Sequence, residues 1–124
     1  MATLNMGISY DLTYDEIDRL VAEGRKGNYA FGYLDERGVF IVRYVGRSDT
    51  DLRERIKHGI KDMENDPTCR YERFKFSYAE TDKEAYEKEC QNYHDFGGPE
   101  GFLVNKNHPD KPEGDTGICP ICGE

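Results

Sequence analysis

Apolar side chains recur with two different periods along the chain, and each period indicates a type of element. Residues 28–34 and 71–78 alternate in the two-residue rhythm of half-buried strands. Residues 39–45 are nearly all apolar and β-branched or aromatic, which favours a buried strand. The turn-forming residues 35–38 connect 28–34 to 39–45. These two segments therefore predict a hairpin whose second strand ends in a tight turn at Gly46.

Three other segments have the spacing of amphipathic helices. Two begin with a capping box, in which Thr13 or Thr81 precedes a glutamate by three residues. The third covers about residues 51–63, and its apolar stripe is Leu52, Ile56, Ile60 and Met63. The order helix, strand, strand, helix, strand, helix predicts an α+β fold. We expect a small three-stranded sheet, antiparallel or mixed, with helices packed against it.

The length of 124 residues suits one domain with one core. We place this domain at residues 1–105, with 1–26 as a helical extension and 106–124 as an irregular tail. No stretch is long and apolar enough to span a bilayer, and residues 1–9 lack the pattern of a signal peptide. We therefore expect a cytoplasmic protein with no membrane partner.

The charge is unevenly distributed. The net charge of −8 argues against unspecific nucleic-acid binding by the whole surface. From Arg43 to Lys61, however, six basic residues accompany three acidic ones, an excess of +3. A local basic site on an acidic body is therefore expected.

Five short matches, in order, resemble the GIY-YIG nuclease superfamily over roughly Gly27 to Asn105. The matching residues are Gly27-Asn28-Tyr29, Tyr44-Val45-Gly46, Arg55, Glu89 and Asn105. Three features depart from the pattern: Asn28 replaces an apolar residue, the segment from Gly46 to Arg55 is one residue longer, and His58 follows Arg55 by three positions. The resemblance implies a GIY-YIG-like fold and a metal-dependent DNA endonuclease.

The chemistry of phosphodiester hydrolysis assigns a role to each matching side chain. Tyr29 or Tyr44 would activate the attacking water, and the other tyrosine would position the phosphate. The planar guanidinium of Arg55 suits a bidentate contact with a phosphate. His58 lies one helical turn further on, within reach of the same phosphate, and is a further candidate catalytic residue. Three residues would contribute to substrate binding: Gly46, Arg47 and Asn105.

Glu89 is the expected ligand of a single catalytic Mg²⁺ or Mn²⁺, because these ions prefer oxygen ligands. It competes for this role with Glu84 and Glu87 in the same segment. The ordinary alternatives are that the tyrosines are core strand residues and that Arg55 forms ion pairs on a solvated face.

The cysteines and histidines predict a second, structural metal site. Cys90 and His94 are four residues apart and would share one helix face. Cys119 and Cys122 form a Cys-Pro-Ile-Cys-Gly knuckle, so these four side chains would complete a tetrahedral zinc set that staples the tail. His108 is an alternative to His94 as the fourth ligand.

Two functional hypotheses follow. The first is an endonuclease that acts on DNA, alone, as a homodimer or with a partner protein. The second is a noncatalytic, zinc-stapled module that binds nucleic acid or protein. Catalysis that depends on Glu89 would separate them.

The zinc site predicts one equivalent of tightly held zinc in the purified protein, because structural zinc sites bind strongly at neutral pH. Metal analysis after dialysis measures it. Protein that folds without zinc would contradict the prediction.

Overall fold

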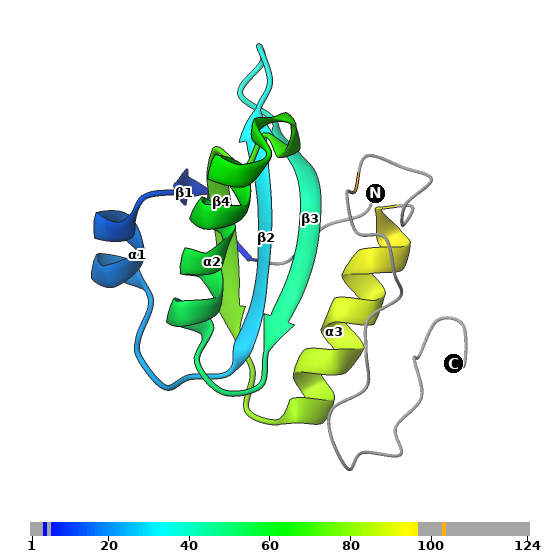
Figure 1. The fold of residues 1–124 in the computed structure, drawn as a ribbon. Helices are drawn as coiled ribbons and strands as arrows, with labels where there is room; N and C mark the ends of the chain where they lie inside the picture. The colour runs from blue at the N-terminus through cyan, green and yellow to red at the C-terminus, as the bar shows by residue number, and fades with distance from the viewer. Residues whose placement is uncertain (1–3, 5, 97–102, 104–124) are drawn as a thin grey trace.

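The computed structural model describes residues 4, 6–96 and 103, and these residues form an α+β fold (Figure 1). The elements, in chain order, are β1 (Tyr10–Asp11), α1 (Tyr14–Leu20), β2 (Gly27–Leu34), β3 (Phe40–Ser48), α2 (Leu52–Asn65), the 3-10 turn η1 (Pro67–Cys69), β4 (Arg73–Tyr78) and α3 (Asp82–Asp95). The predicted α+β class is therefore confirmed for this part of the chain.

The sheet has four antiparallel strands in the order β1-β4-β2-β3. The prediction of three strands was wrong because β1 pairs only Tyr10 and Asp11 with β4. A two-residue strand is too short to show a recognisable alternation in the sequence. The predicted hairpin is confirmed as β2 and β3, and β3 forms one edge of the described sheet.

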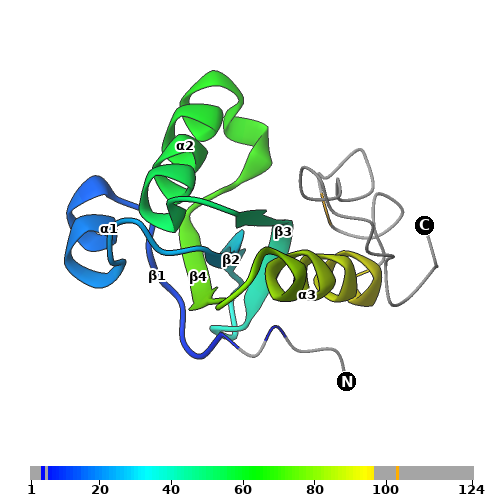
Figure 2. The same ribbon diagram turned by 90° about the horizontal axis from the view of Figure 1, so that it is seen from below.

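Helices cover both faces of the sheet (Figures 1 and 2). On one face α1 and α2 pack over a core that includes Tyr29, Phe31 and Phe74. On the other face Tyr93 of α3 packs with Ala30 and Val45. Neighbouring residues of β2 thus serve opposite layers, as the pleat of a strand requires.

The helix starts follow the sequence signals. Thr81 and Glu84 form a reciprocal capping box at the start of α3, and Thr13 caps α1 by accepting from the backbone N–H of Glu16. Asp51 caps α2 in the same way. The 51–63 segment becomes the longer helix Leu52–Asn65, which ends where Pro67 begins η1.

Strand β3 does not end at Gly46, as the sequence suggested. It continues through Arg47 to Ser48 and stays paired with β2, with Gly46 opposite Tyr29. The glycine therefore does not form a turn. It sits inside a strand, where glycine is expected when another group approaches the backbone closely.

Several predictions concern residues outside the described part of the chain. These are the tail at 106–124, Asn105, His108, Cys119 and Cys122. Among the helices that are described, none has the length and apolarity of a membrane-crossing segment.

Gly59→Ala tests the contact between α2 and the sheet. A Cβ at this position would overlap the Phe31 ring. Overpacking costs about 1–3 kcal/mol, which exceeds the helix propensity gain of about 1 kcal/mol for alanine over glycine. We expect the free energy of unfolding to fall by about 1 kcal/mol in urea denaturation. The exposed Lys61→Ala is the control, and a stabilised Gly59→Ala variant would show that α2 is not tightly packed here.

Candidate functional site

The site is built around the absence of a side chain at Gly46. Tyr29 lies opposite Gly46 across the β2–β3 pair, and a Cβ at Gly46 would overlap the ring and hydroxyl of Tyr29. The tyrosine therefore extends across β3 toward the edge of the sheet. The ring of Tyr44 stacks beside it, with the ring centroids 6.1 Å apart and the planes 16° from parallel.

Arg55, Tyr29 and Tyr44 form a polar chain on the α2 side of the sheet. Arg55 Nε donates to the Tyr29 hydroxyl oxygen at 3.2 Å. A hydrogen bond with Tyr29 in turn lowers the pKa of Tyr44. The Tyr29 hydroxyl oxygen accepts the hydrogen bond from Arg55, so the hydroxyl hydrogen of Tyr29 can be donated to the Tyr44 oxygen. The predicted proximity of the two phenols and the guanidinium is thus present.

The net pKa shifts of both tyrosines are upward. Burial raises the pKa of Tyr29, a residue only 2% exposed, and Arg55 offsets this only in part. Burial also raises the pKa of the half-buried Tyr44. Desolvation therefore outweighs the effect of the nearby Arg55 charge, which favours ionisation of both phenols.

Glu89 approaches the same strand from the opposite face. It lies on α3, its side chain is 11% exposed, and its Oε1 accepts a hydrogen bond from Arg47 Nη1 at 2.5 Å. Arg47 Nε also binds Asp49 at 3.1 Å. Arg47 therefore bridges two carboxylates, whereas the sequence suggested that it contacts a substrate phosphate.

Glu89 is electrostatically part of the tyrosine cluster although α3 and α2 cover opposite faces. Its negative charge raises the pKa of both Tyr29 and Tyr44. Burial raises the pKa of Glu89 itself, and the charges of Arg47 and Arg55 oppose this rise. Glu89 and the tyrosines therefore influence each other electrostatically from opposite faces of the sheet, close to the edge strand β3.

The other predicted residues stand apart from this cluster or outside the described chain. His58 is exposed on α2, and no contact among the described residues joins it to Tyr29 or Glu89. Cys90 and His94 both lie on α3, as predicted, with Cys90 fully buried. Their proposed partners Cys119 and Cys122 are not described.

The basic window does not form a free positive patch. Arg53 and Lys57 bind carboxylates of Asp18 and Glu23 and join α2 to α1. Arg55 makes no ion pair with any described residue. Its guanidinium is therefore the cation of this cluster that is not neutralised by a carboxylate.

The donor set suits one magnesium ion with few protein ligands. Glu89 offers a carboxylate whose Oε2 receives no hydrogen bond from the described residues, and Asp49 lies on the other side of Arg47. No group of three or more potential metal ligands occurs among the residues that the structure describes. Mg²⁺ commonly binds through one or two carboxylates and several waters, so Glu89 and Asp49 are the described residues of this cluster that could hold it.

Sequence reasoning missed Asp49 and the role of Asn28. Asp49 lies only two residues from Arg47, but a single aspartate in a loop has no sequence pattern that marks it as part of a site. Asn28 is fully buried, and its Nδ2 donates to the Ala85 carbonyl at 2.8 Å, while its Oδ1 has no hydrogen bond to the described residues. The sequence did signal a special role for Asn28, because an asparagine stands there in place of the apolar residue of the GIY-YIG pattern. The asparagine ties β2 to the helix that carries Glu89.

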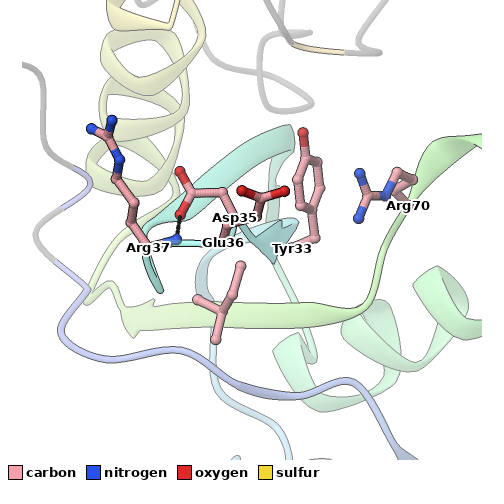
Figure 3. Close-up of a pocket in the computed structure, with 6 residues that line it drawn as sticks. Tyr33, Asp35, Glu36, Arg37 and Arg70 are labelled. Carbon is pink, nitrogen blue, oxygen red and sulfur yellow. Dashed lines mark hydrogen bonds between the residues drawn. The ribbon is translucent and has the colours of Figure 1, made fainter.

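A separate hollow of about 460 Å³ lies at the β2–β3 turn, at the far end of β2 from Tyr29 (Figure 3). Arg70 faces Tyr33 there, with its guanidinium carbon 3.6 Å from the ring centroid. Asp35 binds the backbone N–H groups of the turn. These local interactions account for the polar residues of this hollow.

No protein-family model, no curated protein and no solved structure matches this chain. The resemblance to GIY-YIG nucleases therefore rests on its matching residues.

Glu89→Gln tests the burial of the carboxylate through the pH dependence of stability. Because burial raises the pKa of Glu89, the folded chain binds this proton more tightly than the unfolded chain. Ionisation of Glu89 therefore lowers the free energy of unfolding as the pH rises above the ordinary value of 4.5. The variant lacks this loss, so its stability relative to the wild type should increase with pH.

Urea denaturation of both proteins from about pH 4 to about pH 7.5 measures the difference. The lost Arg47 contact adds an offset but little pH dependence, because arginine stays charged throughout this range. A difference that is constant with pH would contradict the burial of an ionisable Glu89.

Proposed function

We propose that this protein is a metal-dependent DNA endonuclease that hydrolyses phosphodiester bonds with a single divalent metal ion. The observation that carries the proposal is the Arg55–Tyr29–Tyr44 chain beside a buried Glu89 at one strand edge. A guanidinium without a carboxylate partner, two hydrogen-bonded phenols and a buried carboxylate lie around one strand, and perturbed ionisable groups of this kind gather at functional sites.

Tyr44 is the better candidate for the general base. It is half-buried, whereas Tyr29 is 2% exposed and its hydroxyl already accepts from Arg55. A phenolate on Tyr44 would be stabilised by the donated hydrogen bond of Tyr29 and by the charge of Arg55. Tyr29 would then be a positioning residue for the base.

Arg55 would bind the scissile phosphate with the guanidinium nitrogens that Tyr29 does not use. Its single described hydrogen bond engages Nε, so the two terminal amino groups can form a bidentate contact with phosphate oxygens. His58, one helical turn away, stays a proposed catalytic residue that contacts the same phosphate, and Asn105 stays a proposed substrate-binding residue.

Glu89, with Asp49 as a candidate second ligand, would hold the Mg²⁺ or Mn²⁺ ion once Arg47 moves from Oε1 or shares the carboxylate. When bound, the ion would supply charge stabilisation at the phosphate and the leaving oxygen. A positive charge near the phenols also opposes the effect of burial on the pKa of Tyr44. The structural zinc site, with ligands Cys90, His94 or His108, Cys119 and Cys122, belongs to the same proposal.

A cleavage panel tests the proposal. Wild-type protein with Mg²⁺ or Mn²⁺ is incubated with duplex, branched and single-stranded DNA, beside the variants Tyr44→Phe, Arg55→Ala and Glu89→Gln. Each variant should lose at least about 100-fold in cleavage rate, the typical effect of removing an acid–base group or a charge donor.

Glu54→Gln is the matched control, because Glu54 is exposed on α2 next to Arg55 and should leave cleavage unchanged. Melting curves confirm that each variant is folded. The endonuclease is excluded if folded wild type cleaves none of the substrates, or if the three variants retain full activity.

A noncatalytic binding module is the second candidate. The observation that favours it is the Arg47–Glu89 ion pair, since a carboxylate held by an arginine is also a common structural feature. Salt-sensitive DNA binding without any cleavage would support this candidate.

A further inference from the structure

A hollow of about 680 Å³ adjoins the candidate site, between the edge strand β3 and the end of α2. This volume lies within the range of about 300–1,000 Å³ that is typical of small-molecule sites. Its walls include Arg43, Tyr44, Asp62, Asn65, Asp66 and Tyr71. Tyr44 is therefore shared between this hollow and the proposed catalytic cluster.

The hollow has an aromatic side. The ring of Tyr71 meets that of Tyr44 edge to face, with centroids 6.0 Å apart. Tyr71 is held in place by the core, where its ring packs on Phe31 at 4.9 Å. A flat aromatic group that entered here would rest mainly on the half-buried ring of Tyr44, because Tyr71 is only 5% exposed and supports that ring from the core. Aromatic platforms of this kind recur in proteins that bind single-stranded nucleic acid.

The polar side offers hydrogen-bond acceptors. Asp62 and Asn65 are exposed on α2, and no side chain among the described residues donates to the Asp62 carboxylate. The negative charge of Asp62 raises the pKa of Tyr44 and of Tyr71, which agrees with its position on this wall. Arg43 is the one cation among the described residues that line the hollow, and its Nε donates a hydrogen bond to the Cys69 carbonyl.

The acidic and aromatic lining of the hollow suits a nucleobase better than a phosphate group. Asp62 and Asp66 would repel a phosphate group. A base carries ring faces for the tyrosines and exocyclic amino groups that donate to a carboxylate, as cytosine N4 does to aspartate. A base inside a duplex is stacked and paired, so only an unpaired base can enter such a hollow.

We infer that the hollow receives one unpaired base, next to the scissile phosphate, of a DNA substrate that carries a bulge, flap or other extrahelical nucleotide. The inference rests on the proposed endonuclease and names its substrate class. The Asp62 carboxylate favours a base with an amino group, such as cytosine, over thymine, which lacks one.

Three DNA duplexes that differ at a single position test the inference: one fully paired, one with a bulged cytosine and one with a bulged thymine. With Mg²⁺, the bulged cytosine substrate should show a kcat/KM about tenfold above the paired duplex and above the bulged thymine. Asp62→Ala should bring the cytosine-to-thymine ratio close to one. Glu64→Ala, on the same helix but outside the hollow, is the control and should keep the ratio.

The ratio is the readout because the charge of Asp62 also acts on Tyr44, and that effect is common to all substrates. Equal kcat/KM values for paired and bulged DNA would overturn the inference and leave the endonuclease standing. If no DNA is cleaved, the endonuclease proposal is wrong. The affinity of the protein for each DNA, measured by fluorescence anisotropy, then tests whether the hollow binds a base. An affinity preference for the bulged cytosine that Asp62→Ala removes would then support a base-binding site, and equal affinities would overturn it.

Discussion

The contact between the Tyr29 ring and the backbone of Gly46 is the constraint on which the candidate site depends. A side chain at Gly46 would occupy the place of the Tyr29 hydroxyl, which is the group that Arg55 binds. The same contact sets Tyr29 beside Tyr44 at the strand edge. A single missing Cβ therefore allows groups from β2, β3 and α2 to meet, since no larger residue would leave this space open.

The Arg47 bridge is the second constraint, and it belongs to the opposite layer. The negative charge of Asp49 raises the pKa of Glu89, and the guanidinium of Arg47 between the two carboxylates opposes this rise. Arg47 also lies over the Tyr86 ring, 5.3 Å from its centroid. The Arg47–Glu89 ion pair thus holds α3 against β3, and the Asn28 amide holds the same helix against β2.

The sequence predicted the features that local patterns encode. The strands of the hairpin, the capped helices and the placement of Tyr29, Tyr44, Arg55 and Glu89 on their elements all follow from periodicity and short motifs. Strand β1 was not predicted because two residues are too few to show the alternation of a strand. Gly46 was interpreted as a turn because glycine often marks one, whereas its reason here is a ring from a neighbouring strand. Arg47 and Glu89 are 42 residues apart, and no local pattern reveals such a pair.

The location of the site on an edge strand has a consequence for self-association. Sheet edges commonly accept a further strand, and β3 is an edge of the sheet that the described residues form. A second chain added there would lie directly beside Tyr44 and the hollow next to it. If DNA reaches Tyr44 as proposed, a strand added along β3 would compete with it for this edge, so we expect an active homodimer to join through another surface.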